Sequence, residues 1–153
     1  MKRLLAAAAA LISVSAAQAQ PAAKAPMPNL NVFPRMLHVY ATPDGQSHIE
    51  QLTISNKAGP APLTTLSALS YNPTNVGWHN APSPQFAINL TGTLEVELSD
   101  GSRHRIGPGD LVLIEDIKGK GHVTRLVTPV TCLFIRVAPG FDVRKWAAGK
   151  AGS

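Results

Sequence analysis

The chain has 153 residues, a formal net charge of +5 at pH 7 and a single cysteine. One cysteine excludes an internal disulfide, and the length allows one domain with one hydrophobic core. The basic residues are scattered along the sequence, so the positive charge does not indicate a nucleic-acid-binding surface.

The N-terminus has the layout of a secretory signal peptide. Lys2 and Arg3 precede an apolar run over residues 4–14, and Ala17-Gln18-Ala19 provides a cleavage site. The run is too short to remain as a transmembrane helix, and no cysteine near the cut offers a lipid anchor. We therefore predict a signal peptide at residues 1–19, no membrane anchoring after its removal, and a periplasmic or secreted protein.

Residues 20–31 are rich in Pro and Ala and are expected to form a flexible lead-in, because each proline removes a backbone hydrogen-bond donor. From about Val32 onward, short apolar alternations are separated by turn residues, and almost no segment has helical periodicity. This pattern predicts one all-β domain over residues 32–140, followed by a short helix and tail over residues 141–153.

The clearest strand has Leu94, Val96 and Leu98 on one face and polar residues on the other. Asp100-Gly101 then predicts a hairpin turn. The short C-terminal helix is expected at residues 143–148, with Asp142 as its N-cap. The strands are predicted at residues 36–41, 47–55, 63–70, 85–90, 93–98, 104–106, 111–114 and 124–137.

Two segments carry a family resemblance. The stretches WHNAPSPQFAINLTG and IGPGDLVLIEDIKGKGHVTR resemble the two sequence motifs of the cupin superfamily, and the Gly-Lys-Gly-His loop before residue 123 resembles that of some small single-domain cupins. Positions of the first motif match His79, Ala81, Gln85 and Gly92, and the final histidine of the second matches His122. The resemblance covers about residues 36–138 and implies a double-stranded β-helix, or jelly-roll, barrel.

The family pattern of three imidazoles and a carboxylate is reduced in this chain. Ala81 replaces one histidine and Gln85 replaces the glutamate. The resemblance implies a site for one divalent transition metal at His79, Gln85 and His122, with water in the remaining positions. Loss of an anionic ligand and an imidazole predicts weaker metal binding than in the complete set.

A pocket that holds no metal is the alternative for the same residues. Gln85, Ala87 and Asn89 share one side of their strand, which would line the barrel with amides and a small residue. We expect a small polar ligand bound by His79, Gln85, Asn89 and His122.

The opposite side of that strand carries Phe86, Ile88 and Leu90, which must pack against something. A second subunit is one candidate, so the sequence predicts a homodimer.

The remaining motifs are assigned structural roles. No Ser or Thr follows a Gly-Lys pair, so no nucleotide is expected. His38 is expected to be a surface or cross-strand residue, and His48 with Glu50 is the one histidine–carboxylate pairing predicted among the other histidines. Asp110 and Asp116 are expected in turns.

Three functions remain open at this point. The first is an exported cupin that binds a small molecule without catalysis. The second is a metal-dependent cupin enzyme of the oxygenase, isomerase or decarboxylase type, and the third is a structural barrel. No nucleophile elbow or Cys-x-x-Cys pair is present, so no catalytic residue is assigned.

Overall fold

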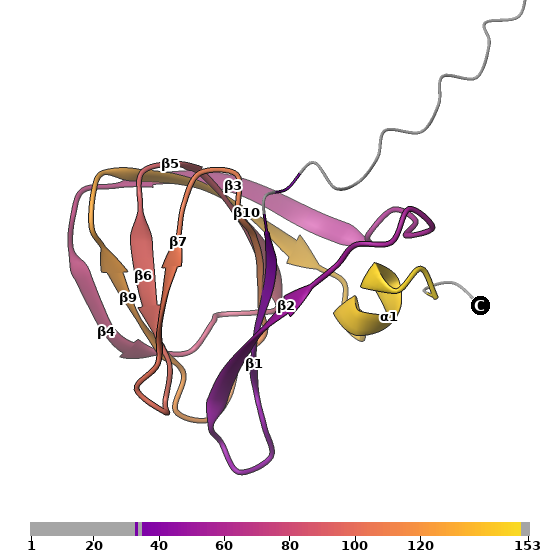
Figure 1. Cartoon of the computed structure of the whole chain (residues 1–153), viewed down its shortest axis with the longest axis horizontal. Coiled ribbons are helices and arrows are strands. Elements are labelled where there is room, and N and C mark those ends of the chain that lie inside the picture. Colours follow the sequence, from indigo (N-terminus) through magenta and orange to yellow (C-terminus); the bar gives the residue numbers. More distant parts are fainter. Residues whose placement is uncertain (1–32, 34, 151–153) are drawn as a thin grey trace, which may run out of the picture.

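The computed structural model describes residue 33 and residues 35–150, which contain ten strands and one short helix (Figure 1). They confirm the predicted all-β jelly-roll barrel with a C-terminal helix. The elements are β1 (Met36–Ala41), β2 (Ser47–Leu52), β3 (Leu63–Tyr71), β4 (Asn75–His79), β5 (Gln85–Thr91), β6 (Leu94–Glu97), β7 (Arg103–Ile106), β8 (Leu111–Ile114), β9 (His122–Leu126), β10 (Val130–Val137) and α1 (Val143–Ala147).

The described strands form two sheets that enclose the barrel interior. One has six strands in the order β2-β1-β8-β5-β10-β3, and the other has four in the order β4-β9-β6-β7. Within this part of the chain, β1 and β8 pair in parallel and the other neighbours are antiparallel. Apolar residues of both sheets, such as Val39, Val112 and Val96, meet in one core cluster inside the barrel and hold the sheets together.

A second core cluster lies on the outer side of the six-stranded sheet, beneath α1. Trp146 of the helix packs against Phe86 of β5 and against Phe141, with ring centroids 5.8 Å apart in both pairs. Its indole Nε1–H donates a hydrogen bond to the carbonyl oxygen of Gly59 at 2.7 Å. The apolar face of β5 at Phe86 is thus covered by the chain's own helix, and the sequence-based reason for placing a second subunit there does not apply.

The ends of α1 follow the predicted capping. The Asp142 side chain accepts a hydrogen bond from the Lys145 backbone N–H at 2.9 Å, as an N-cap should. Gly149 has a φ of 72°, a left-handed conformation that favours glycine after the last turn of a helix.

Two strand predictions were wrong. β4 was not predicted, because Gly77 interrupts its short apolar pattern. The single strand predicted over residues 124–137 is two strands, since β9 and β10 are separated by Val127, Thr128 and Pro129. The backbone N–H groups of Val127 and Thr128 donate to the Thr93 carbonyl oxygen, and Pro129 has no N–H to continue a ladder.

The predicted signal peptide and lead-in fall outside the described residues and remain predictions. Among the residues that are described, no helix combines the length and the apolar character needed to cross a membrane.

Candidate functional site

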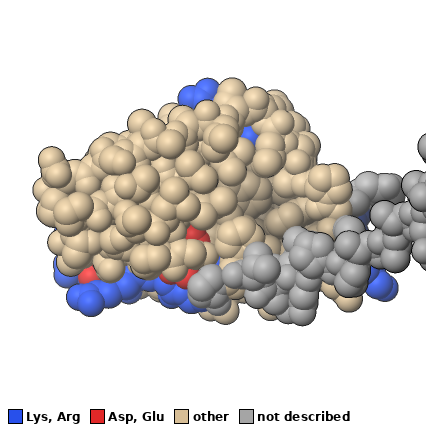
Figure 2. All heavy atoms as spheres, turned by 90° about the horizontal axis from the view of Figure 1, so that it is seen from above, with Lys and Arg blue, Asp and Glu red and all other residues tan. Residues whose placement is uncertain are grey.

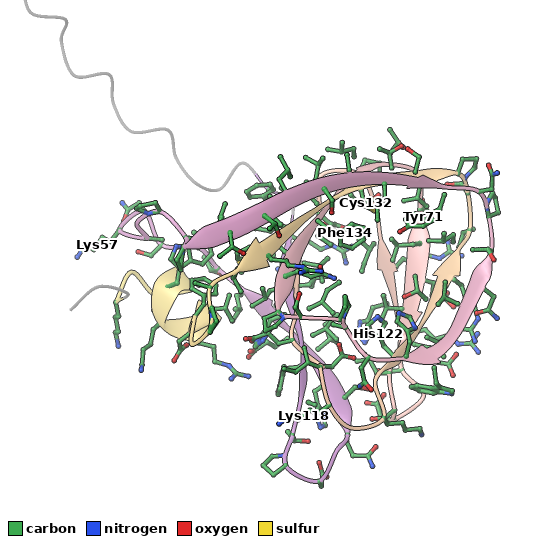
Figure 3. All side chains as sticks on the ribbon, turned by 180° about the vertical axis from the view of Figure 1, so that it is seen from behind. Lys57, Tyr71, Lys118, His122, Cys132 and Phe134 are labelled. Atoms are coloured by element: carbon green, nitrogen blue, oxygen red, sulfur yellow. The ribbon has the colours of Figure 1, made fainter. Side chains whose placement is uncertain are left out.

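A cavity of about 250 Å³ lies between the two sheets. Figure 3 shows the side chains of Tyr71, His122, Cys132 and Phe134 in the space that the strands enclose. Polar groups are few, and most lining residues are apolar, so the polar lining expected from the sequence is only part of the wall. The lining residues are Val39, Tyr71, Val76, His79, Ala81, Pro82, Gln85, Ala87, Asn89, Leu94, Val96, Ile106, Val112, Ile114, His122, Thr124, Leu126, Cys132 and Phe134.

The two motif histidines meet at this cavity. His79 ends β4 and His122 begins β9, and the antiparallel register places them directly opposite each other. Their ring centroids are 4.3 Å apart, and both residues line the cavity. Two imidazoles that are distant in sequence therefore share one wall.

Gly121 allows this close approach. Its φ of 72° lies in the left-handed region, and a Cβ atom added there would overlap the carbonyl oxygen of His79. The glycine before His122 is therefore required by backbone packing between β4 and the start of β9.

Hydrogen bonds at Nδ1 fix the orientation of both rings. Nδ1 of His79 lies 2.7 Å from the carbonyl oxygen of Gly77, which can only accept, so this nitrogen carries the proton and donates. Nδ1 of His122 lies 2.6 Å from Oδ2 of Asp116 and donates to that carboxylate. In the neutral form of each ring, Nε2 is then left with its lone pair.

Asp116 is the site residue that the sequence did not reveal. It was expected in a turn, but it is fully buried, and its second oxygen, Oδ1, has no hydrogen-bond partner among the described residues. The side-chain amide of Asn80 donates a hydrogen bond to the backbone carbonyl oxygen of Asp116 at 2.9 Å. This bond ties the Asp116 loop to the end of β4. An aspartate in a loop six residues before a histidine gives no signal in sequence, because their contact depends on the path of the loop.

Gln85 and Asn89 lie on β5 with their side chains on the cavity side, as predicted. Both are buried. The Asn89 amide donates to the Gly92 carbonyl oxygen at 2.9 Å, and its Oδ1 accepts a weak hydrogen bond from Cys132 Sγ at 3.5 Å. Much of the hydrogen-bonding capacity of Asn89 is thus used within the protein, whereas no such internal bond engages the Gln85 side chain among the described residues.

Cys132 lines the cavity from β10 and is buried. Burial raises the pKa of its thiol above the ordinary value of 9.0, so the thiol stays protonated at neutral pH.

The residues present fit a resident metal ion poorly. His79, Gln85 and His122 would offer two neutral nitrogens and one amide oxygen, without an anionic ligand to offset the ion's charge. Across the described residues, no group of three or more His, Cys, Asp and Glu side chains is arranged to hold a metal ion. Asp116 is a carboxylate close to this set, but it contacts Nδ1 of His122, which is not the ring nitrogen left free for a metal ion.

A second histidine cluster lies outside the cavity and corrects the predicted pairing of His48 with Glu50. His38 is a cross-strand residue, which was one of its two predicted placements; it is buried, and its Nδ1 and Nε2 lie 2.8 Å from Glu50 and 2.6 Å from Glu115. His48 contacts Thr42 instead of Glu50. The reason is register: His38 and Glu50 are directly opposite across β1 and β2, which brings side chains closer than two positions along one strand.

No protein-family model matches this sequence, and no curated protein matches it either. Similar solved structures include a cupin superfamily protein from Desulfitobacterium hafniense, at 16% identity and a TM-score of 0.39 over 47% of this chain and 64% of that chain. A cupin-2 domain protein from Shewanella frigidimarina has 19% identity and a TM-score of 0.40 over 48% and 69%. A cupin domain from Bordetella pertussis has 16% identity and a TM-score of 0.38 over 52% and 92%. The jelly-roll barrel of this chain is defined by its own strand order.

Proposed function

We propose that this chain is an exported binding protein whose barrel holds one small, mainly apolar molecule with a single polar head group, contacted by His79, Gln85 and His122. The observation that carries the proposal is the pair of imidazoles 4.3 Å apart in the wall of a mostly apolar cavity between the two sheets.

The polar end of the cavity supports a hydrogen-bond donor as the head group. Nδ1 of each imidazole is engaged with a protein acceptor, so Nε2 of each neutral ring is an acceptor. The Gln85 amide can either donate or accept. A hydroxyl group satisfies such a set, and an apolar molecule of the same shape leaves buried acceptors unpaired.

The size and lining of the cavity support a small apolar body. A volume of about 250 Å³ lies just below the roughly 300–1,000 Å³ of typical ligand pockets, which favours a small ligand. Leu94, Val112 and Phe134 are among the apolar side chains that would contact the ligand body. The sequence led us to expect a small polar ligand. The lining of the cavity favours a mainly apolar molecule with one polar end instead.

Phenol and toluene provide a matched pair of probes, since they share a ring and differ in the hydroxyl group. We expect phenol to raise the melting temperature of the purified protein more than toluene does. A probe at a hundred times its Kd stabilises the folded state by about 2.7 kcal/mol. In the His79→Ala/His122→Ala double variant, the preference for phenol over toluene should become smaller, because only Gln85 of the three polar groups remains. Equal shifts in the wild type, or no shift with either probe at millimolar concentration, would contradict the proposal.

A metal-dependent enzyme of the oxygenase, isomerase or decarboxylase type is the second candidate. It is favoured by the Asp116–His122 contact, because a histidine that binds a metal through one ring nitrogen is commonly oriented by a carboxylate at the other ring nitrogen. Elemental analysis of purified protein loaded with iron, manganese, nickel, copper or zinc separates the two candidates. Stoichiometric metal that is lost in both His79→Ala and His122→Ala supports the enzyme, and a metal content near zero in the loaded wild type removes it.

Export rests on the N-terminal pattern of Lys2, Arg3 and the apolar run that follows. N-terminal sequencing of protein recovered from the periplasm or the medium should begin at Gln20. Recovery of the uncleaved chain from the cytoplasm alone would contradict this part of the proposal.

A further inference from the structure

Strand β3 is an edge with no neighbour on one side. It pairs with β10 along its length, and the described part of the chain supplies no strand for its other side. All nine of its residues are exposed, including Leu63, Leu66, Leu69 and Tyr71. An edge of this length offers a row of unpaired backbone groups to another strand.

β3 also lacks charged side chains, which on other edge strands oppose pairing with a second molecule. β2, at the far edge of the same sheet, carries Glu50, and β7 carries Arg103 and Arg105. β3 reads LTTLSALSY, with neither a charged residue nor a proline. Figure 2 views the molecule from the side along which β3 runs in Figure 1, and few charged side chains appear on that face.

The sequence of β3 is complementary to itself in antiparallel pairing. With a two-fold axis at Ser67, the strand's central residue, Leu66 would lie opposite the small Ala68 of the second copy. Leu63 would lie opposite Tyr71, and Thr65 opposite Leu69. No like charges would meet, although the chain as a whole carries a net charge of +5.

We propose that two copies of this chain form a symmetric dimer by antiparallel pairing of their β3 strands about Ser67. The second copy is the occupant because an isologous two-fold contact uses the same surface twice, and β3 meets that requirement in shape and in charge. The other uncharged edge, β4, is less suited, since the Lys120 ammonium lies over the Trp78 ring, 4.8 Å from its centroid. The evidence for the dimer does not depend on the ligand proposed above, although Tyr71 of β3 also lines the cavity.

The first test is molar mass in solution. Size-exclusion chromatography with light scattering should give twice the mass of one chain for the purified wild type at about 50 µM, since association depends on protein concentration. Leu66→Lys places two cations beside the axis and should shift the protein to the mass of one chain. Ile117→Lys is the matched control, because Ile117 is also an exposed apolar residue but lies in the β8–β9 loop. Its mass should equal that of the wild type.

Single cysteines test the register. Directly opposed residues of an antiparallel pair have Cα atoms about 4.5–5.5 Å apart, which a disulfide can bridge. Ser67→Cys should therefore form a covalent dimer under mild oxidation. Ser70→Cys should not, because the two copies of this position would be about 20 Å apart, six residues along the strand. The parent protein, whose Cys132 is buried, should also stay uncrosslinked.

Three results overturn the proposal. One is a wild type with the mass of one chain. Another is a dimer that Leu66→Lys leaves intact. The last is a dimer in which Ser70→Cys crosslinks and Ser67→Cys does not.

Discussion

Glu50 is held between two hydrogen-bonding partners at the junction of the sheet and α1. It accepts hydrogen bonds from Nδ1 of His38 at 2.8 Å and from Nε of Arg144 at 2.7 Å. The guanidinium of Arg144 also lies over the Tyr40 ring, 4.6 Å from its centroid. The other imidazole nitrogen of His38 contacts Glu115. This cluster links the first two strands to the C-terminal helix by charge.

The cluster predicts a loss of stability in acid. Partial burial alone would raise the pKa of Glu50, but the hydrogen bonds and charges of His38 and Arg144 outweigh it and hold the pKa below its ordinary value of 4.5. A carboxyl group with a lower pKa in the folded state stabilises that state above its unfolded pKa. The contribution is lost as the pH falls through the folded value.

Glu50→Gln should therefore weaken the pH dependence of stability below about pH 4.5. Urea unfolding of the wild type and of Glu50→Gln at pH 7, 5, 4 and 3 gives the free energy of unfolding of each protein at each pH. The free energy of the wild type should fall more steeply than that of Glu50→Gln as the pH drops. Parallel curves for the two proteins would show that this carboxyl group does not contribute.

Gly121 gives a residue-scale prediction at the site itself. Gly121→Ala introduces a left-handed alanine, at a cost of about 1–2 kcal/mol, and also a Cβ that overlaps the His79 carbonyl oxygen. Gly101→Ala is the matched control, because its φ of 82° is similar and the space around it is open. We expect Gly121→Ala to be the more destabilising of the two in urea unfolding, and to weaken phenol binding. Equal losses in the two variants would mean that the backbone contact with His79 is not limiting.

At the scale of elements, α1 is the part of the fold that covers the outer apolar side of the six-stranded sheet. Trp146 is 8% exposed and packs on two phenylalanine rings, so Trp146→Ala should cost about 3–5 kcal/mol of unfolding free energy. Trp78 is 46% exposed on β4, and Trp78→Ala should cost less than about 1 kcal/mol. Urea unfolding followed by circular dichroism compares them. Similar costs would contradict the role assigned to the helix.

Strands with a regular two-residue alternation, such as β6, or with a short apolar run between turn residues, such as β8, were predictable from sequence. Leu94 and Val96 predict β6, and Asp100-Gly101 predicts its turn, where Gly101 has a left-handed φ and its N–H donates to the Leu98 carbonyl oxygen. β4 was missed because Gly77 interrupts its short apolar pattern and the strand exists through its pairing with β9. Pairing between distant segments leaves little local trace in the sequence.

At the scale of the whole molecule, the motif spacing predicted that His79 and His122 share one cavity. It did not predict which residues surround them. Asp116 reaches His122 through a loop whose path is a tertiary feature, and the apolar majority of the lining comes from strands of both sheets. Likewise, the packing of α1 on Phe86 was not predicted, because a short helix at the C-terminus does not reveal in sequence which face it packs against.

The position of Cys132 has a practical consequence for work on this protein. It is the only thiol in the chain, and it faces the cavity from the side of β10. A bound ligand would shield it, so the rate at which methyl methanethiosulfonate converts this thiol into a methyl disulfide, with release of methanesulfinate, should fall in proportion to occupancy. Mass spectrometry of the unaltered chain could then screen candidate metabolites without a label and without an assay for catalysis. A rate unchanged by saturating phenol would show that guest and thiol do not share the same space.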